Sequence, residues 1–221
     1  MASYRLQDDL SFCRIDGRLI FLDIRNDRYF RLSTDLERIF VAHVEGTDGM
    51  ADVAPLVERN ILTAAPPSPS AARHPIENAS LSALELPSPL TPNGRSAVVE
   101  ALAIVCWTQI QLKTRSLKAT LNNTVARRRR TGALDRCDIE PRLLKETLTF
   151  LKARKLVPVE NRCLLDSLSL TTFLARRDLY ASIVFGVTSD PFSAHCWVQS
   201  GKIVLNDTLG HTRAYTVVQV I

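Results

Sequence analysis

The sequence predicts an α+β fold in which strands come first, helices fill the middle and strands return at the end. Short strand patterns separated by turn signals occupy residues 11–33. Long alanine- and leucine-rich segments with helical spacing occupy 95–154, and strand patterns resume after Arg177. Helices followed by an antiparallel sheet are typical of α+β domains.

The N-terminal part predicts a three-stranded meander followed by helices. Asp16-Gly17 separates "SFCRI" from "RLIFLDI", and Asp-Gly readily adopts the positive φ angles of a tight hairpin turn. A second polar turn, "RNDR", leads into "YFRLS". Thr34 and Glu37 have the spacing of a capping box, which predicts a helix start, and Gly46 predicts its end.

Three segments follow from these patterns. Residues 1–64 form a small domain, which includes a second helix over about 50–60. Residues 65–94 carry seven of the eleven prolines and predict a linker, because proline removes backbone donors and fixes φ. Residues 95–221 form the second domain, with helices first and an antiparallel sheet last.

Composition limits the classes of protein that fit. The 221 residues are 46% hydrophobic and 23% charged, which is typical of a globular protein. Five scattered cysteines form no CxxC pair, so we expect free thiols, with no disulfide framework or zinc site. No apolar run is long enough for a membrane span and no secretory signal is evident, so we expect a cytoplasmic protein. Cys106 and Trp107 are expected to pack in the core.

The net charge is +5, and residues 126–130 read "ARRRR". A solvated charge run explains this segment best. Nucleic-acid binding is disfavoured because no interleaved aromatics or DNA-binding helix accompany it. Docking of an acidic partner stays open, so the sequence leaves the role of Arg127–Arg130 undecided.

Cys163 opens the apolar helical stretch "CLLDSLSLTTFLARR". The unpaired amides and positive dipole end of a helix N-terminus lower a thiol pKa, and the thiolate is the nucleophilic form. The same amides can stabilise an oxyanion. By itself, however, a cysteine in an apolar helix is usually a small core residue.

His195, in "FSAHCWVQ", and Asp207, in "GKIVLND", lie on successive predicted strands. A three-residue loop would pair Gln199 with Ile203 and make His195 face Asp207, whereas a two-residue turn would point Asp207 to the opposite face. We expect the first register or a bulged equivalent. His195 would then serve as the general base for Cys163 and Asp207 would orient it. Separately, a strand histidine and a turn aspartate are ordinary structural residues.

The order Cys163, His195, Asp207, with a helix before a sheet, resembles the transglutaminase-like cysteine peptidases. Within that group the three motifs resemble the B proteins of lasso-peptide biosynthesis, and the N-terminal meander and helices resemble their PqqD-like recognition element. The resemblance implies a winged-helix-like first unit and a transglutaminase- or papain-like second domain. It also implies Cys163 as nucleophile, His195 as general base and Asp207 as orienting acid.

The function that this resemblance implies is that of a leader peptidase. The first unit would bind the leader of a ribosomal precursor peptide, and the second would cleave leader from core. The freed amine would pass to an asparagine-synthetase-like cyclase, which uses ATP to close a macrolactam; no cofactor or metal is expected in this chain. Cys196 replaces a common alanine and is expected to pack, Gln199 receives no role, and His211 is treated as a turn residue.

Leader binding is expected by strand addition to the exposed edge of the small sheet. Tyr29 and Arg31 are the expected contacts, and most of the apolar members are expected to close the core. The groove would be formed by Tyr29, Phe30, Arg31, Leu32, Leu56, Val57 and Asn60. A transglutaminase-like acyltransferase, a non-catalytic precursor chaperone and, more remotely, a nucleic-acid binder stay as alternatives.

Overall fold

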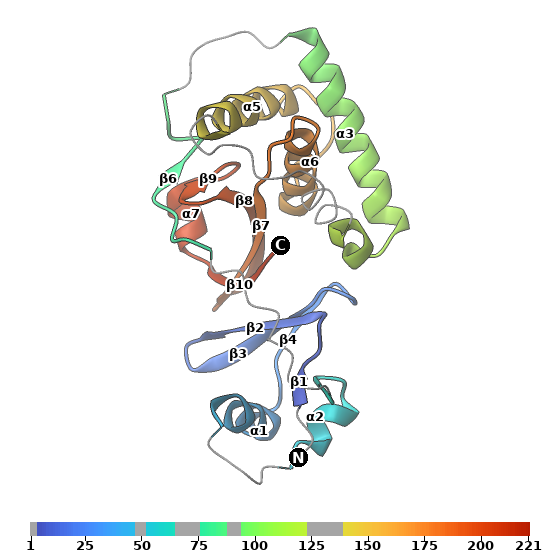
Figure 1. The fold of residues 1–221 in the computed structure, drawn as a ribbon, viewed down its shortest axis with the longest axis vertical. Helices are drawn as coiled ribbons and strands as arrows, with labels where there is room; N and C mark the ends of the chain where they lie inside the picture. The colour runs from blue at the N-terminus through green and yellow to red at the C-terminus, as the bar shows by residue number, and fades with distance from the viewer. Residues whose placement is uncertain (1–3, 47–51, 65–75, 88–93, 123–138) are drawn as a thin grey trace. The chain divides into compact units, whose positions relative to one another are not determined.

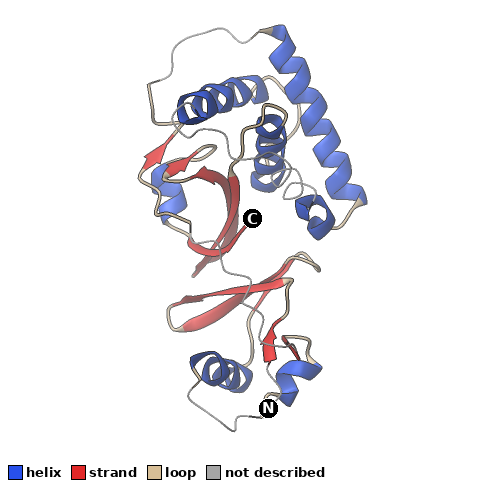
Figure 2. Ribbon diagram, viewed as in Figure 1, coloured by secondary structure: helices blue, strands red, loops and turns tan. Residues whose placement is uncertain are grey.

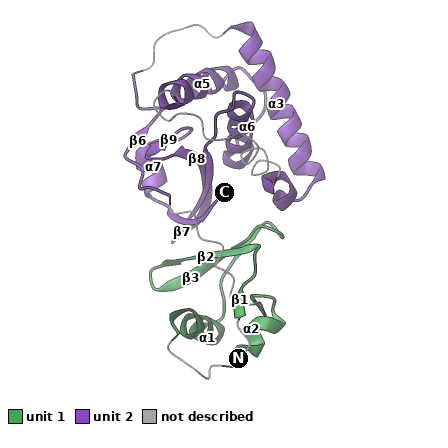
Figure 3. Cartoon of the chain, viewed as in Figure 1, with its two compact units in different colours: residues 1–75 green, residues 76–221 purple. Residues whose placement is uncertain are grey.

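The computed structural model describes residues 4–46, 52–64, 76–87, 94–122 and 139–221 (Figure 1). The chain divides into two compact units, Met1–Pro75 and Ile76–Ile221 (Figure 3). The arginine run at 126–130 and Cys137 lie outside the described residues. Strands and helices both contribute to each unit, which confirms the α+β class (Figure 2).

The first unit contains the predicted three-stranded antiparallel sheet, with strand order β2-β3-β4. A separate antiparallel pair is formed by β1 and β5. The hairpin turn between β2 and β3 has φ angles of 49° at Asp16 and 75° at Gly17, as the Asp-Gly signal predicts. The elements are β1 (Tyr4–Leu6), β2 (Leu10–Ile15), β3 (Arg18–Asp23), β4 (Arg28–Phe30), α1 (Thr34–Glu45), α2 (Ala54–Glu58) and β5 (Leu62–Ala64).

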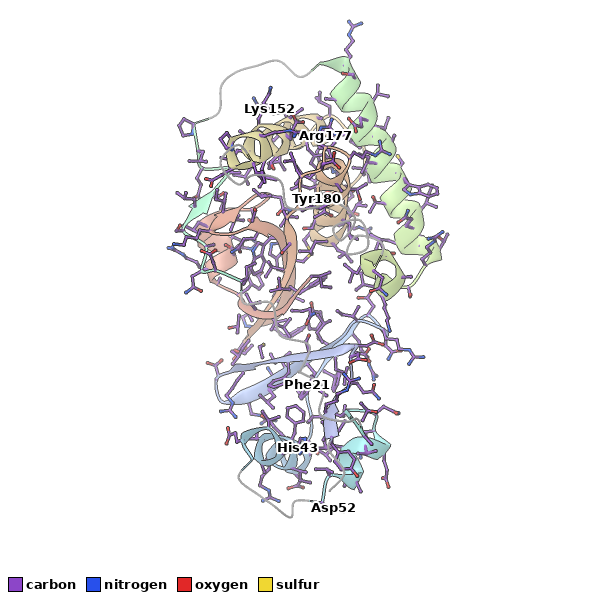
Figure 4. The ribbon with its side chains drawn as sticks, viewed as in Figure 1. Phe21, His43, Asp52, Lys152, Arg177 and Tyr180 are labelled. Atoms are coloured by element: carbon purple, nitrogen blue, oxygen red, sulfur yellow. The ribbon has the colours of Figure 1, made fainter. Side chains whose placement is uncertain are left out.

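Aromatic side chains from the sheet and α1 make the core of this unit. Phe21 on β3 is fully buried and is labelled in Figure 4. Its ring lies 5.2 Å from that of Phe30 and 5.1 Å from that of Phe40, measured between centroids, and Phe12 lies 5.0 Å from Phe40. Stacked and edge-on contacts of this kind stabilise a core beyond the burial of apolar area.

Thr34, the predicted N-cap, is instead the first residue of α1, so the start of the helix is predicted to within one residue, but the predicted capping box does not form. Ser33 is the cap residue of α1, and no side chain caps the helix. The carboxylate of Glu37 instead accepts the backbone N–H of Leu19 at 2.8 Å, so it connects α1 to β3. Glu37 is buried, so its carboxylate needs a donor inside the protein, and the Leu19 amide supplies one. Gly46 ends the helix with a φ angle of 66°, as expected.

The second unit contains a five-stranded sheet with the order β10-β7-β8-β9-β6 and four labelled helices. All neighbours are antiparallel except β6 and β9, which are parallel. A further helical segment covers 117–122. The elements are β6 (Leu81–Ser82), α3 (Arg95–Thr114), α5 (Ile139–Arg154), α6 (Cys163–Ala175), β7 (Ser182–Ser189), β8 (Phe192–Ser200), β9 (Ile203–Val204), α7 (Leu209–Arg213) and β10 (Thr216–Val220).

The predicted linker over 65–94 extends too far. Its part from 76 to 87 belongs to the second unit, where β6 pairs with β9 and Ala83 is fully buried. Residues 76–86 contain no proline, so their backbone donors are free to join a sheet. The remainder of the predicted linker, apart from Gly94, lies outside the described residues.

Helix α6 forms the centre of the second unit and packs against α3, α5 and β8. Phe173 on α6 lies 5.2 Å from Phe150 on α5, and the Arg177 guanidinium lies 3.6 Å above the Phe173 ring. Arg177, labelled in Figure 4, also pairs with Glu100 and Glu146 at 2.7 Å each. Eight of the thirteen α6 residues are buried, so the helix that begins at Cys163 is firmly held.

Trp107 does not pack in the core, contrary to the prediction, and is 56% exposed. The buried face of α3 runs through Ala101, Ile104, Val105 and Thr108, and Trp107 lies about 100° around the helix from Thr108. Cys106 is half-buried. No helix in the described part of the chain is long and apolar enough to cross a membrane.

Candidate active site

Cys163 is the first residue of α6 and is exposed. Arg162 precedes it with extended backbone, and the first intrahelical bond runs from the Asp166 N–H to the Arg162 carbonyl at 2.9 Å. The amides before Asp166 therefore stand at the positive end of the helix without an intrahelical acceptor. This position favours a thiolate at Cys163.

A buried arginine secures the segment that leads to Cys163. Arg154, at the end of α5, is only 5% exposed, and its Nε donates to Asp166 Oδ1 at 2.7 Å. Its other nitrogens donate at 3.0 to 3.3 Å to the carbonyls of Val157, Val159 and Glu160. One side chain thus fixes both the loop before α6 and the first turn of the helix.

His195 lies on β8, and the structure places Asp207 directly against it. The distance between His195 Nε2 and Asp207 Oδ2 is 2.5 Å, and both side chains are about 15% exposed. The Nε2 atom is therefore occupied by the carboxylate, which leaves Nδ1 of the ring as the nitrogen for a second partner. The Cys163 thiol is that partner, since its hydrogen bond with His195 shifts the pKa of both groups.

The predicted hairpin register is wrong. Ser200 pairs with Ile203 and Gln199 with Val204 across a two-residue turn, in which Gly201 has a φ angle of 52°. A regular continuation of this pairing would point Asp207 away from His195. The chain avoids that outcome by leaving the sheet: β9 ends at Val204, and the following residues bend out of the strand.

Asn206 replaces the missing strand pairing. The last backbone bond of the hairpin runs from the Leu205 N–H to the Val198 carbonyl at 2.8 Å. The Val198 N–H then donates to Asn206 Oδ1 at 2.7 Å, and Asn206 Nδ2 donates to Ser167 Oγ on α6 at 3.0 Å. This side chain connects β8 with α6 and turns the next residue, Asp207, toward His195.

One further segment, which contains Ser82 and Glu85, holds the Asp207 loop. The Ser82 hydroxyl, from the segment predicted to be a linker, donates to the Asp207 carbonyl at 2.6 Å. Nearby, the Glu85 carboxylate accepts the N–H of Leu209 at 3.1 Å. The N–H of Thr208 donates to the other carboxylate oxygen of Asp207, Oδ1, at 2.7 Å.

His211 joins the site, although the sequence indicated only a turn residue there. It lies on the short helix α7, and the distance from its Nδ1 to Asp207 Oδ2 is 2.8 Å. Its ring centroid is 4.6 Å from that of His195, and Tyr215 lies 5.2 Å from His195. The ligand atoms of His195, Asp207 and His211 all lie within 4.8 Å of one another, so these residues could hold a metal ion. Their mutual hydrogen bonds account for the arrangement without one.

The electrostatics favour a thiolate beside an imidazolium. Hydrogen bonds from the Cys196 thiol and from His195 lower the pKa of Cys163 from 9.0 to about 4. Burial works to lower the pKa of His195, but its bonds with Asp207 and Cys163 outweigh burial and raise that pKa to about 9. Between these values both groups are charged.

The two neighbouring carboxyl groups respond in opposite ways. Burial works to raise the pKa of Asp207, but donation from His195 and His211 outweighs it and the net pKa is lowered. Burial is the main cause that raises the pKa of Asp166, despite its partner Arg154, and the nearby Cys163 charge adds to this. Asp207 therefore stays ionised where the imidazolium needs a counter-charge.

Cys196 packs as expected, but it also interacts with the candidate nucleophile Cys163. It is 3% exposed, and its Sγ lies 3.9 Å from Ser167 Oγ, one turn after Cys163 on α6. A hydrogen bond with Cys163 is the main cause that raises the pKa of Cys196, and burial raises it further. Strand alternation predicted that Cys196 would face away from His195 and only pack. It could not show that the start of α6 lies against that face of β8.

Gln199, which received no role from the sequence, is 3% exposed and has a structural one. Its Oε1 accepts the indole N–H of Trp197 at 3.1 Å. Its Nε2 donates to the carbonyls of Glu77 and Gly201 at 2.7 and 2.8 Å. An amide can both donate and accept here, which a carboxylate cannot do.

The expected leader-binding residues lie in two environments. Leu32 and Leu56 are buried in the core and Phe30 stacks on Phe21, so these three close the unit. The exposed or half-buried members are Tyr29, Arg31, Val57 and Asn60. Among the described strands, β4 is bonded only to β3 and is an edge of its sheet.

A family model matches most of the second unit. A family model described as the transglutaminase-like superfamily matches residues 103–220, which include Cys163, His195 and Asp207. The chain belongs to the transglutaminase-like superfamily, which includes cysteine peptidases and transglutaminases. No curated protein and no solved structure matches the chain.

Proposed function

We propose that this chain is a cysteine peptidase that separates the leader from the core of a ribosomally made lasso-peptide precursor. The observation that carries the catalytic part is the Cys163–His195–Asp207 arrangement, with a thiol pKa of about 4 next to a histidine pKa of about 9. A charged pair of this kind supplies a nucleophile and an acid at neutral pH.

In the first step the Cys163 thiolate attacks the carbonyl carbon of the scissile peptide bond. The negative charge that develops on the carbonyl oxygen is stabilised by amides at the start of α6, which precede the first intrahelical bond. The His195 imidazolium gives its proton to the leaving amine, so the C–N bond breaks and the new N-terminus departs neutral.

In the second step water attacks the thioester on Cys163. His195, now neutral, accepts a proton from that water, and the C–S bond breaks to restore the thiolate. Asp207 remains ionised throughout and holds the ring through Nε2. The products are a leader with a free carboxylate and a core with a free amine.

The first unit would act as a winged-helix-like, PqqD-like recognition element. The edge strand β4 would bind the leader. An extended peptide would pair with the backbone of β4, and Tyr29 and Arg31 would contact its side chains. Support comes from the edge position of β4, from the exposure of Arg31 and from the partial exposure of Tyr29. Leu32 and Leu56 support this edge from the core and make no contact with the peptide.

The proposed partners are the precursor peptide and an ATP-dependent cyclase resembling asparagine synthetase. The cyclase would join the freed core amine to an acidic side chain as a macrolactam. This chain needs only water as its second substrate, so ATP belongs to the partner. Cleavage and cyclisation would therefore be consecutive reactions of one maturation sequence in the cytoplasm.

Intact-mass spectrometry tests the proposal. The precursor encoded beside this gene is incubated with the wild-type chain, with Cys163→Ala and with Cys106→Ala, a control at the half-buried thiol of α3. Wild type and the control should yield two fragments whose masses sum to the precursor plus one water, and Cys163→Ala should yield none. Cleavage by Cys163→Ala would remove this residue from the mechanism.

The same site supports acyl transfer as a second candidate, because an amine can replace water at the thioester. The superfamily includes both reactions. Product mass separates them: transfer joins the acyl fragment to the added amine, whereas hydrolysis leaves a carboxylate. If the wild type binds the precursor but leaves it intact, with cyclase and ATP present, the chain is a delivery protein instead.

A further inference from the structure

Asp207 has one carboxylate oxygen that serves two imidazole rings. Its Oδ2 lies 2.5 Å from His195 Nε2 and 2.8 Å from His211 Nδ1. An ionised carboxylate only accepts hydrogen bonds, so both ring nitrogens must carry a proton and donate. The contact of Asp207 with His195 belongs to the proposed Cys163–His195–Asp207 triad. The contact with His211 has no role in that mechanism.

The His211 ring is held from several sides. Its backbone N–H donates to the Thr208 side chain that caps α7, at 3.3 Å. Its ring meets Tyr215 edge-on, with centroids 5.3 Å apart, and the Tyr215 hydroxyl lies 3.4 Å from Ser193 Oγ on β8. Although the His211 side chain is 49% exposed, these contacts aim its Nδ1 at Asp207.

We propose that His211 is a positioning residue, which fixes the Asp207 carboxylate in the orientation that receives His195. Asp207 sits on a bent segment outside the sheet, where no strand pairing restrains its side chain. Thr208 N–H holds Oδ1 and His211 holds Oδ2, so the carboxylate plane is fixed at both ends. This inference rests on the proposed role of the Cys163–His195 pair.

Loss of the His211 contact would change how the rate falls at low pH. Donation from His211 is one of the causes that lower the pKa of Asp207, so its loss raises that pKa. The carboxylate is then protonated at a higher pH, and the imidazolium and thiolate lose their support there. The titratable or charged groups around Asp207 and its loop are His195 on β8, Cys163 on α6, His211 and Arg213 on α7, Tyr215 before β10, and Glu85 after β6.

The test compares His211→Phe, which keeps an aromatic ring, with His211→Asn, whose amide nitrogen can occupy the position of Nδ1. The rate of Cys163 alkylation by iodoacetamide is measured against pH by site-resolved mass spectrometry, which needs no peptide substrate. In His211→Phe we expect the midpoint of the acid limb to rise by about half a unit to one unit. The rate of precursor cleavage should fall about tenfold with little change in KM. His211→Asn should restore most of both values.

Other outcomes overturn the inference. Equal alkylation profiles for wild type and His211→Phe would show that His211 is a bystander. A wild-type profile that shifts after treatment with a chelator would assign the cluster to a metal ion. If His211→Phe loses its fold, His211→Gln is the second variant: its amide reaches past the Nδ1 position, so the midpoint must still rise. A His211-dependent profile in a chain that leaves the precursor intact would contradict only the proposed peptidase function.

Discussion

The two ends of the site are built in different ways. Cys163 stands at the first residue of a thirteen-residue helix, and its position follows from regular helical geometry. Asp207 stands in a bend after a two-residue strand. Its position depends on Ser82, which bonds to its carbonyl, on His211, which bonds to its carboxylate, and on the preceding Asn206, whose side chain bonds to Val198 and Ser167. The helical end depends on local periodicity, whereas the loop end depends on contacts that reach across 125 positions of the chain.

The largest effect is expected at the loop end, from Asp207→Asn. The neutral amide cannot stabilise the His195 imidazolium, so the pKa of His195 falls and the thiolate loses its partner. Precursor cleavage at neutral pH should drop on the order of a thousandfold, as for orienting acids in other triads. Alkylation of Cys163 at pH 5.5 should fall as well.

Asp178→Asn is a control for this change, because Asp178 lies in the turn after α6. It should leave both rates within about twofold, since surface substitutions are small in effect. A full rate in Asp207→Asn would mean that the short contact with His195 has no part in the chemistry. The loop end would then be only structural.

Arg154→Met tests the helical end. The change leaves Asp166 in a half-buried site without its counter-charge, and removes the donors for the carbonyls of the loop before α6. We expect the free energy of unfolding to fall by about 3 kcal/mol, which is typical when one member of a buried ion pair is removed. Urea unfolding followed by the fluorescence of Trp197, which is 3% exposed, measures this.

Lys145→Met provides the matched comparison, since Lys145 is exposed on the same helix. Its unfolding midpoint should match that of the wild type. Equal midpoints for both variants would show that the Arg154 network contributes nothing net, because the desolvation of its charges cancels its hydrogen bonds.

The regular elements were predictable from the sequence because each depends on a short local pattern, as the helical end of the site does. Asp16-Gly17 predicts the first hairpin because few residues tolerate its φ angles, and Gly46 predicts a helix end for the same reason. Leucine spacing predicts α5 and α6, and Cys163 at the start of α6 follows from that boundary. These are local properties of short segments.

The loop end was not predictable because its determinants are distant in sequence. Nothing local shows that Ser82 bonds to Asp207 or that Asn206 takes the place of a strand partner. The two-residue turn, read alone, would have turned Asp207 away from His195. The contact between Asp207 and His195 forms because Asn206 redirects the chain after the turn. An alternating residue pattern does not show this.

Asn206→Ala sharpens this comparison with a smaller effect. The N–H of Val198 loses its acceptor and Ser167 loses a donor, so the free energy of unfolding should fall by about 2 kcal/mol. Asn206→Asp keeps the acceptor for Val198 and should recover about half of the loss. Urea unfolding of the two variants measures both values, and no loss in Asn206→Ala would show that β8 does not need this side chain.

The smallest effect is expected from a change at Cys196, which lies between the start of α6 and β8. Its thiol is the first cause that lowers the pKa of Cys163, so Cys196→Ala should raise the Cys163 pKa from about 4 by about one unit, or about 1.4 kcal/mol. A higher pKa lowers the thiolate fraction of Cys163 only at pH values close to that pKa. Alkylation should therefore slow at pH 4.5 and stay unchanged at pH 7. Cys196→Ser keeps a donor and should shift less. If both variants alkylate like the wild type at pH 4.5, the helix end and His195 alone account for the thiolate, and Cys196 is the packing residue that strand alternation predicts.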